Sequence, residues 1–168
     1  MDTVSITIDE VEVQARKGAT VLEAAQEADI YIPSLCSHPD LPSSREVKPV
    51  ECVYRKDQAT QSTSTREHEG CQLCVVEVKG TSDYPTSCTT PVEEGMVVLT
   101  DTPALKEVRQ RNLARILNDH PHTCLTCAQR EGCARVPCSR GVDYNERCCP
   151  LLGRCEFQKV IDHIGRIL

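Results

Sequence analysis

Twelve cysteines among 168 residues are the feature that most limits what this chain can fold into. Apolar residue types make up 39% of the sequence, but that figure counts cysteine, and without it the share falls to about 32%. Ordinary globular domains reach about 45–50%, glycine included. Because the chain also has no tryptophan, we expect burial alone to be too weak, and disulfides, zinc or iron–sulfur clusters to supply the missing stability.

The N-terminus helps to choose among these three. Met1 to Thr3 lead directly into an alternating pattern, without the basic stretch and apolar core of a signal peptide. We therefore expect a cytoplasmic protein, in which a reducing environment disfavours disulfides and favours metal. No apolar run approaches the length of a membrane span, so direct membrane insertion is not expected. The net charge of −6 and the scattered basic residues argue against nucleic acid as a partner.

The first hundred residues read as a small mixed sheet with one short helix. Residues 4–8 and 11–15 alternate as a β-hairpin, and Thr20 with Glu23 has the spacing of a capping box before a helix that ends ahead of Ile30. Residues 74–78 and 96–99 read as two further strands of the same sheet.

A polar insertion of about residues 42–69 interrupts this half. Its segment 58–65 is predicted to be the least structured part, and only residues 50–54 could pair as a strand.

Two helices are expected in the second half. Thr102 and Pro103 are typical of a helix start, and apolar residues at helical spacing predict a helix to about Asn118. A final amphipathic helix carries Phe157, Val160, Ile161, Ile164 and Leu168 on one side. The sequence thus predicts domains at 1–100 and 101–168, and we expect the two apolar helix faces to need a docked subunit that buries them.

Four cysteines of the first half have the pattern of a [2Fe–2S] ligand set. Cys36, Cys71, Cys74 and Cys88 are separated by 34, 2 and 13 residues. Such a cluster needs four converging thiolates, and a Cys-x-x-Cys turn offers two of them from one loop.

Several motifs in a fixed order accompany these cysteines. They are Gly18-x-Thr20-Val21-Leu22-Glu23-Ala24-Ala25, Ile32-Pro33-x-Leu35-Cys36-x-His38-Pro39, Gly70-Cys71-x-x-Cys74-Val75-Val76-Glu77-Val78 and Ser87-Cys88-Thr89-Thr90-Pro91. Together they resemble the [2Fe–2S] ferredoxin domain that opens the large iron–sulfur subunit of respiratory complex I, and its relatives in NAD-dependent formate dehydrogenases and iron hydrogenases. The resemblance covers about residues 3–100. It implies an α+β chain, in which a β-grasp [2Fe–2S] ferredoxin-like domain precedes a small helical, cysteine-rich cluster-binding domain.

The chain departs from that family between the first two ligands. The resemblance implies roughly a dozen residues there, among the varied spacings of such clusters, whereas this chain has 34, including Cys52. Longer loops cost little, so the insertion need not move the cluster. Cys52 either replaces Cys36 as a ligand or, as we favour, is a thiol without that role.

A second group, His120, Cys124, Cys127 and Cys133, follows the first of these helices. Its His-x3-Cys-x2-Cys-x5-Cys spacing resembles the family motif that binds a [4Fe–4S] cluster through one histidine and three cysteines. His122 is the alternative histidine. By itself a histidine near cysteines is more often a zinc ligand or a capped surface residue.

Four further cysteines, Cys138, Cys148, Cys149 and Cys155, have no counterpart in the common family pattern. Residues 153–158 resemble the surroundings of that motif's third cysteine, so Cys133 and Cys155 compete to complete its cluster. Either way, the eight residues of the tail are enough for two [4Fe–4S] sites. Adjacent Cys148 and Cys149 are expected to serve different clusters, or one of them none. The alternative is a zinc-binding knot.

No phosphate loop, catalytic triad or dinucleotide fingerprint occurs in the chain. Because the catalytic domains of the family relatives do not follow before Leu168, we expect a non-catalytic electron-transfer subunit with one [2Fe–2S] and two [4Fe–4S] clusters. The resemblance implies an NAD(P)H-oxidising flavoprotein subunit as partner, within an anaerobic complex such as an electron-bifurcating oxidoreductase. The rival hypotheses are a zinc-stabilised interaction module and a cluster-based redox sensor.

Overall fold

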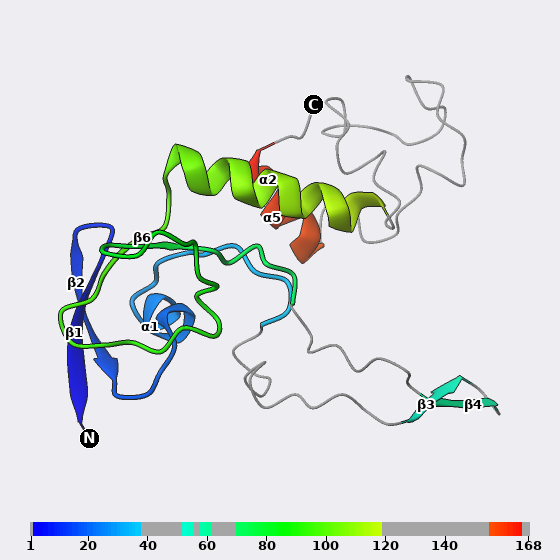
Figure 1. Cartoon of the computed structure of the whole chain (residues 1–168), viewed down its shortest axis with the longest axis horizontal. Helices are drawn as coiled ribbons and strands as arrows, with labels where there is room; N and C mark the ends of the chain where they lie inside the picture. Colours follow the sequence, from blue (N-terminus) through cyan, green and yellow to red (C-terminus); the bar gives the residue numbers. More distant parts are fainter. Residues whose placement is uncertain (1, 38–51, 56–57, 62–69, 119–154, 166–168) are drawn as a thin grey trace.

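The computed structural model describes residues 2–37, 52–55, 58–61, 70–118 and 155–165 of the chain. Their centre is a four-stranded mixed sheet in the order β2-β1-β6-β5 (Figure 1). Strand β1 (Thr3–Ile8) pairs antiparallel with β2 (Val11–Arg16) and parallel with β6 (Val97–Leu99), and β6 pairs antiparallel with β5 (Glu77–Val78). The predicted mixed sheet is confirmed.

Local turn chemistry explains the hairpin of β1 and β2. The two residues between the strands, Asp9 and Glu10, have φ of 47° and 70°, as a two-residue hairpin turn of this kind requires. The Asp9 carboxylate accepts hydrogen bonds from the backbone N–H of Thr100, at 2.7 Å, and from its hydroxyl, which ties the turn to the end of β6. Alternate side chains of the hairpin then enter the core.

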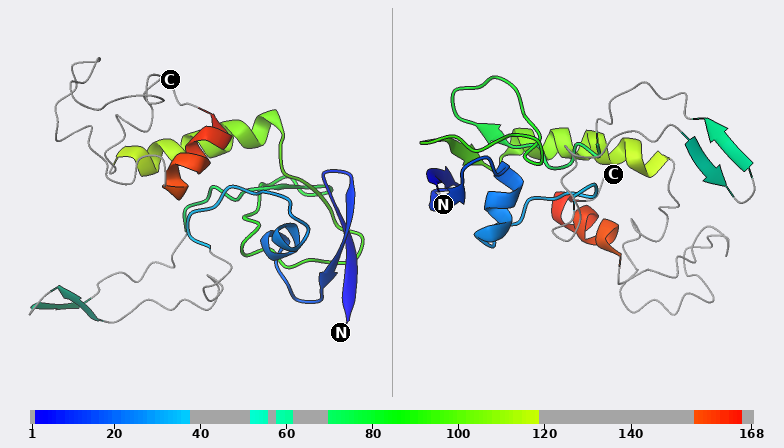
Figure 2. Two further views of the ribbon diagram at one scale, coloured as in Figure 1. Left: turned by 180° about the vertical axis from the view of Figure 1, so that it is seen from behind. Right: turned by 90° about the horizontal axis from the view of Figure 1, so that it is seen from below.

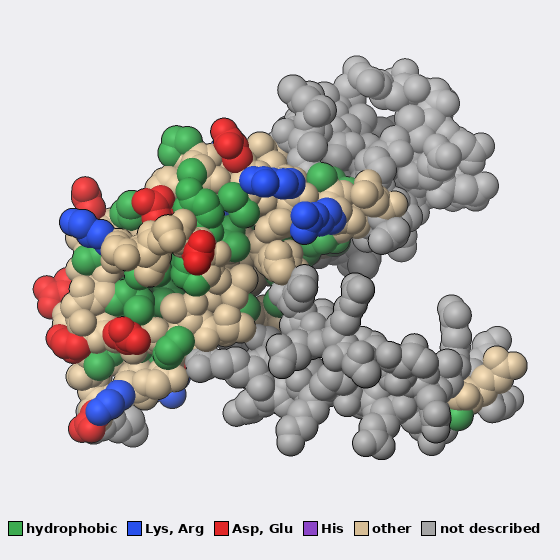
Figure 3. Space-filling model, viewed as in Figure 1, with side chains coloured by type: hydrophobic (Ala, Val, Ile, Leu, Met, Phe, Trp, Pro, Cys, Tyr) green, Lys and Arg blue, Asp and Glu red, His purple; other side chains and the backbone are tan. Residues whose placement is uncertain are grey.

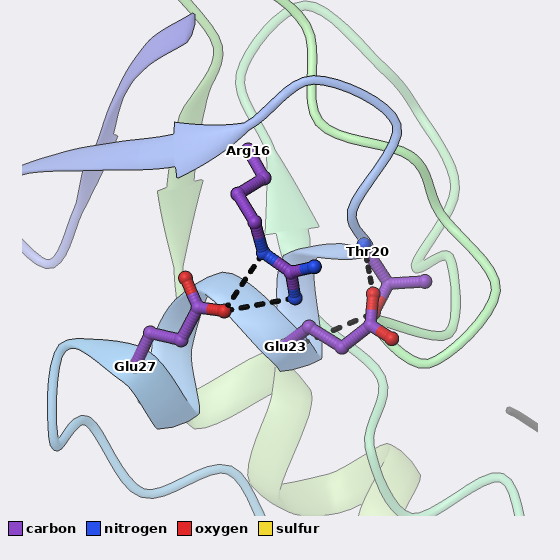
Figure 4. Close-up of polar contacts among 4 residues, drawn as sticks. All are labelled: Arg16, Thr20, Glu23 and Glu27. Carbon is purple, nitrogen blue, oxygen red and sulfur yellow. Dashed lines mark hydrogen bonds and ion pairs between the residues drawn. The ribbon is translucent and has the colours of Figure 1, made fainter. Parts of the chain in front are cut away.

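Helix α1 (Val21–Glu27) begins at the predicted capping box (Figure 4). The Thr20 hydroxyl accepts from the Glu23 backbone N–H at 3.1 Å, and the Glu23 carboxylate accepts from the Thr20 N–H at 2.6 Å. One face of the helix is fully buried against the sheet, where it forms the first core. This core contains Ile6, Ile8, Val13, Ala15, Ala19, Val21, Leu22, Ala24, Ala25, Ile32, Cys74, Val76, Val78, Cys88, Val92 and Val98.

The polar insertion contains more structure than its sequence predicts. Strand β3 (Cys52–Arg55) overlaps the predicted 50–54 strand, but β4 (Gln58–Gln61) lies in the segment expected to be unstructured. That expectation was wrong for residues 58–61, because antiparallel pairing satisfies backbone groups whatever the polarity of the side chains. The hairpin lies apart from the main sheet (Figures 1 and 2).

The strand predicted over 74–78 is shorter in the structure. Only Glu77 and Val78 form β5, because the preceding residues pair with a loop. The Val76 N–H donates to the Pro85 carbonyl at 2.9 Å, and the Ser87 N–H donates to the Cys74 carbonyl at 2.9 Å. This pairing brings the segment around Cys88 next to Cys74.

Helices α2 (Pro103–Asn118) and α5 (Glu156–Ile164) match both predicted helices and pack against each other (Figure 2). They share a second core that also includes Leu73, from the Cys-x-x-Cys loop. The apolar faces of the described helix residues are thus buried within the chain, so they are not by themselves evidence for a docked subunit. The buried members of this core are Leu73, Leu113, Leu117, Phe157, Val160, Ile161 and Ile164; Leu168 lies outside the described residues.

Charged side chains are unevenly distributed over the face shown in Figure 3. Acidic side chains are spread over the part that contains the sheet, and basic side chains are visible both on that part and over α2. In the part of the chain that the structure describes, no helix is long and apolar enough to cross a membrane. The predicted boundary near residue 100 falls between β6 and α2, and the division into two domains stays a prediction.

Candidate metal centre

The four cysteines of the first half approach one another in two pairs. Cys36 follows α1, Cys71 and Cys74 lie in the loop before β5, and Cys88 lies between β5 and β6. The Cys36 and Cys71 sulfur atoms are 3.5 Å apart. The Cys74 and Cys88 side chains are hydrogen-bonded to each other, and Cys71 is close enough to Cys74 for their charges to interact. None of these four described cysteines forms a disulfide.

This arrangement of thiols matches the donor set of a two-iron group. Among the described residues, no three His, Cys, Asp or Glu side chains gather where they could hold one metal ion. A [2Fe–2S] cluster is held by four cysteine thiolates, two on each iron. Two adjoining thiol pairs are the donor set that this chemistry requires, so the residues present fit the group.

Backbone N–H groups point at two of the sulfur atoms. The Leu35 N–H donates to the Cys71 sulfur at 3.4 Å, and the Leu73 N–H also donates to it. The Cys88 N–H donates to Cys74. Such donors stabilise a thiolate, and they tune the potential of a bound cluster.

The two middle cysteines differ in acidity. The hydrogen bond with Cys36 raises the pKa of Cys71 well above its ordinary value, and burial adds to the effect. The pKa of Cys74 is lowered, chiefly by the hydrogen bond from the Cys88 side chain, which outweighs its burial. Of these two thiols, Cys74 more readily carries negative charge before metal binds, whereas Cys71 must lose its proton on binding.

Gly70 allows the Cys-x-x-Cys loop to approach Cys36. Its φ is +69°, and a Cβ at this position would lie 3.3 Å from the Cys36 sulfur. Gln72 has φ of 52°, a left-handed conformation that a residue other than glycine rarely adopts. The loop is thus a strained turn that its surroundings must hold in place.

Helix α2 supplies that support through two buried polar residues. The Asn112 side-chain amide donates to the Gln72 carbonyl at 2.8 Å, and Arg109 Nη2 donates to the Val75 carbonyl at 2.7 Å. Sequence reasoning missed both residues. They lie four and seven positions after Leu105 on the same helix face, and this polar pair within an apolar stripe was the signal that could have revealed them.

The remaining predicted ligands are mostly outside the described residues. This applies to His120, Cys124, Cys127, Cys133, Cys138, Cys148 and Cys149. Cys155 immediately precedes α5 and is half-buried against the second core, which Cys71 also contacts. Cys52 is the first residue of β3.

Comparison with known proteins gives a family match over residues 1–103, to a family described as a 2Fe-2S iron-sulfur cluster binding domain. The chain is 34% identical over 133 residues to the NADP-reducing hydrogenase subunit HndD of Solidesulfovibrio fructosivorans, covering 79% of this chain and 20% of the relative. It is 29% identical over 130 residues to the NADH-ubiquinone oxidoreductase 75 kDa subunit of Reclinomonas americana, covering 77% and 15%.

A third relative is the NADPH-Fe(3+) oxidoreductase subunit alpha of Geobacter sulfurreducens, with 31% identity over 124 residues, 74% of this chain and 12% of the relative. Among solved structures, the crystal structure of an NAD+-reducing [NiFe]-hydrogenase in the H2-reduced state aligns with a TM-score of 0.48 and 28% identity, covering 77% of this chain and 42% of that one. The chain spans a fifth or less of the length of these three curated relatives.

Proposed function

The chain belongs to the 2Fe-2S iron–sulfur cluster binding domain family, and from this premise we propose that it transfers single electrons through a [2Fe–2S] cluster held by Cys36, Cys71, Cys74 and Cys88. The predicted family is confirmed, and with it the predicted [2Fe–2S] cofactor. The observation that carries the ligand assignment is the meeting of these cysteines in two adjoining thiol pairs.

The bound cluster would supply one-electron chemistry, and the chain supplies its surroundings. Cys74 and Cys88 are buried in the first core, so water is excluded from their side of the site. Cys36 and Cys71 are half-buried. Because electron exchange with a partner requires a short path to the surface, the Cys36 and Cys71 side is the side at which electrons enter or leave.

Cys36 is preferred over Cys52 as the first ligand. Its sulfur contacts Cys71 and sits against the loop at Gly70, whereas Cys52 begins a hairpin apart from the main sheet. The 34-residue separation from Cys71 need not move the ligands, because a longer loop costs little free energy.

The cysteine-rich segment is proposed to hold two [4Fe–4S] clusters as a second domain, over residues 101–168. His120, Cys124 and Cys127 would bind one of them with either Cys133 or Cys155, and the other cysteines of the tail would bind the second. The contact of Cys155 with the core that Cys71 also touches supports a second cluster near the first. Electrons could then pass from one cluster to the next across this core.

The partners are inferred from what the relatives are called. By name, those proteins are subunits of an NADP-reducing hydrogenase, an NADH-ubiquinone oxidoreductase and an NADPH-Fe(3+) oxidoreductase. We infer that this chain relays electrons between an NAD(P)H-linked flavoprotein subunit and another redox subunit, in the cytoplasm of an anaerobic organism, within a complex such as an electron-bifurcating oxidoreductase.

Iron, acid-labile sulfide and zinc measured on anaerobically purified full chain test this proposal, together with electron paramagnetic resonance (EPR) of the reduced sample. Three clusters predict about ten iron atoms and negligible zinc. A content of about six iron atoms per chain would mean that only one [4Fe–4S] cluster is present. A content of about two iron atoms together with zinc would limit electron transfer to the first domain. Zinc without iron would overturn the proposal in favour of a zinc-stabilised interaction module.

Two variants then test the ligand set. Cys74→Ser is expected to abolish the [2Fe–2S] signal, because serine is a poor substitute for a thiolate on iron. Cys52→Ser is the matched control, and we expect it to leave iron content and signal unchanged. Loss of the signal in Cys52→Ser would instead make Cys52 the ligand.

A further inference from the structure

Two buried side-chain polar atoms lack a hydrogen-bond partner in the part of the chain that the structure describes, and both lie beside Cys74. They are Ser87 Oγ and Arg109 Nε. Ser87 is fully buried and Arg109 is 2% exposed. Because a buried polar group without a hydrogen-bond partner destabilises the fold, two such groups at one place point to a group that completes their interactions.

Ser87 is held against Cys74 by its backbone. Its N–H donates to the Cys74 carbonyl at 2.9 Å, and its carbonyl accepts from the Leu22 N–H at 3.0 Å. The Ser87 hydroxyl is close enough to the Cys74 sulfur to help lower the pKa of that thiol, after the larger effect of Cys88. The hydroxyl therefore faces sulfur in the interior of the protein.

Arg109 reaches the same place from α2. Its Nη2 is anchored on the carbonyl of Val75, the residue after Cys74, while Nε remains free. Burial lowers the pKa of Arg109, and the negative charges that oppose this effect include Asp101, Cys74 and Asp9. Arginine stays protonated in proteins, so a positive charge is kept in the interior next to a cysteine.

A buried cation without a close counter-ion is costly. No ion pair of Arg109 occurs among the described residues, so the cost calls for another negative charge nearby. Cluster thiolates at Cys74 and Cys88 would supply that charge. The Cys36 and Cys71 side differs, since the donors described there are backbone N–H groups of Leu35 and Leu73.

We propose that Ser87 and Arg109 are positioning residues that stabilise negative charge on the Cys74 side of the cluster site and thereby raise its reduction potential. The proposal rests on the proposed function. Reduction adds one electron to the site, supplied by the NAD(P)H-linked flavoprotein, and no proton. The added negative charge is stabilised by the guanidinium through its charge and by the hydroxyl through a hydrogen bond to sulfur.

The test compares Ser87→Ala, Arg109→Gln and Arg109→Lys with wild type in the full chain, purified anaerobically. Iron and sulfide content show whether the cluster is present. Reductive titration monitored by EPR of the [2Fe–2S] signal measures its midpoint potential. Thr89→Ala and Arg111→Gln are the controls, because Thr89 is an exposed residue next to Cys88 whose hydroxyl contacts Thr86, and Arg111 is an exposed arginine of α2.

Arg109→Gln is expected to lower the equilibrium constant for reduction of the cluster about tenfold, which lowers its midpoint potential by about 59 mV for one electron. Ser87→Ala is expected to lower this equilibrium constant severalfold. Arg109→Lys is expected to retain most of the wild-type potential, because lysine keeps the positive charge. The controls should shift the equilibrium less than twofold.

An unchanged potential in variants that retain the cluster would overturn the inference and leave the proposed function intact. If Arg109→Gln lost its cluster, Ser87→Ala would decide, because the only described group that this variant deprives of an interaction is the Cys74 sulfur. An unchanged potential in Ser87→Ala would then overturn the inference. Wild-type chain without a [2Fe–2S] signal would overturn both, and the iron content separates that result from the others.

Discussion

Single residues decide whether the cysteine loop can close on Cys36. Gly70 and Gly80 both have positive φ, at +69° and +95°, but only Gly70 has a sulfur atom where its Cβ would be. A side chain at Gly80 meets nothing within 4 Å. Substituting each glycine by alanine therefore distinguishes the cost of the left-handed backbone conformation, which both variants share, from the cost of crowding Cys36, which only the variant at Gly70 has.

Gly70→Ala and Gly80→Ala are each expected to lower the free energy of unfolding by about 1–2 kcal/mol, the cost of a left-handed conformation for a residue with a Cβ. Only Gly70→Ala should also reduce iron and sulfide content, because its Cβ would press on the Cys36 sulfur. Thermal unfolding and iron analysis of both variants check this. Equal cluster content in the two would show that the contact with Cys36 has no role.

His163 on α5 gives the fold a pH dependence. Its ring meets Tyr31 edge-on, with centroids 4.8 Å apart. Partial burial lowers the pKa of His163 below 6.5, and Arg109 lowers it further against the opposing effect of Asp101. The unfolded chain then binds the proton more tightly than the folded one, so stability falls as the pH drops below about 6.5.

His163→Phe keeps an aromatic ring beside Tyr31 and removes the titrating group. We expect the melting temperature of the wild type to fall more steeply between pH 7 and pH 5 than that of His163→Phe. Thermal scans at fixed rate under argon give both curves. Parallel curves would contradict the expectation.

At the scale of elements, a short sequence motif predicts structure reliably when its side chains form hydrogen bonds with backbone groups at the end of a helix. Helix α1 has a polar interaction at each end, and both are drawn in Figure 4. The two interactions contribute differently to the stability of the fold. The Thr20 and Glu23 capping box satisfies N–H groups of the first turn, whereas the Arg16 to Glu27 ion pair, at 2.9 Å, is exposed to solvent.

Thr20→Ala is expected to lower the free energy of unfolding by about 1 kcal/mol, the usual cost of losing an N-cap. Glu27→Gln should change it by less, because screening leaves an exposed ion pair worth about 0–1 kcal/mol. Chemical denaturation of the two variants, compared with wild type, measures the difference. A larger loss in Glu27→Gln would reverse our ranking of the two interactions.

At the scale of the whole molecule, the second core joins the cysteine loop to the two helices. Leu73 lies between Cys71 and Cys74 and is fully buried among side chains of α2 and α5. The loop that carries two proposed ligands is therefore held on one side by the first core and on the other by the helices. Stability of the helix pair and retention of the cluster are expected to be coupled.

Leu73→Ala is expected to lower the free energy of unfolding by about 2–5 kcal/mol and to accelerate loss of iron on exposure to a chelator. Val11→Ala, at a side chain that is 51% exposed, should do neither. Release of iron over time from both variants checks the coupling. Destabilisation of Leu73→Ala without faster iron release would show that the helices do not support the site.

Much of the fold followed from short-range patterns. The hairpin, the capping box and both helices were predicted because alternation, turn residues and caps act within a few residues. Strand β4 was missed because polar residues can form a ladder that side-chain patterns do not reveal. Arg109 and Asn112 were missed because hydrophobic periodicity assigns polar residues to the solvent face, and only a packed partner turns them inward.

By itself the sequence determined the local conformations and the kinds of donor available: thiols, the Cys-x-x-Cys turn of residues 71–74 and the glycine before it. Only the tertiary structure decided which sulfurs meet, with Cys36 against Cys71 and Cys88 beside Cys74. It also decided that an arginine lies buried beside the site. The physical reason is range: turns and caps depend on neighbours in the chain, whereas these contacts join residues 14 to 35 positions apart through the packing of two cores.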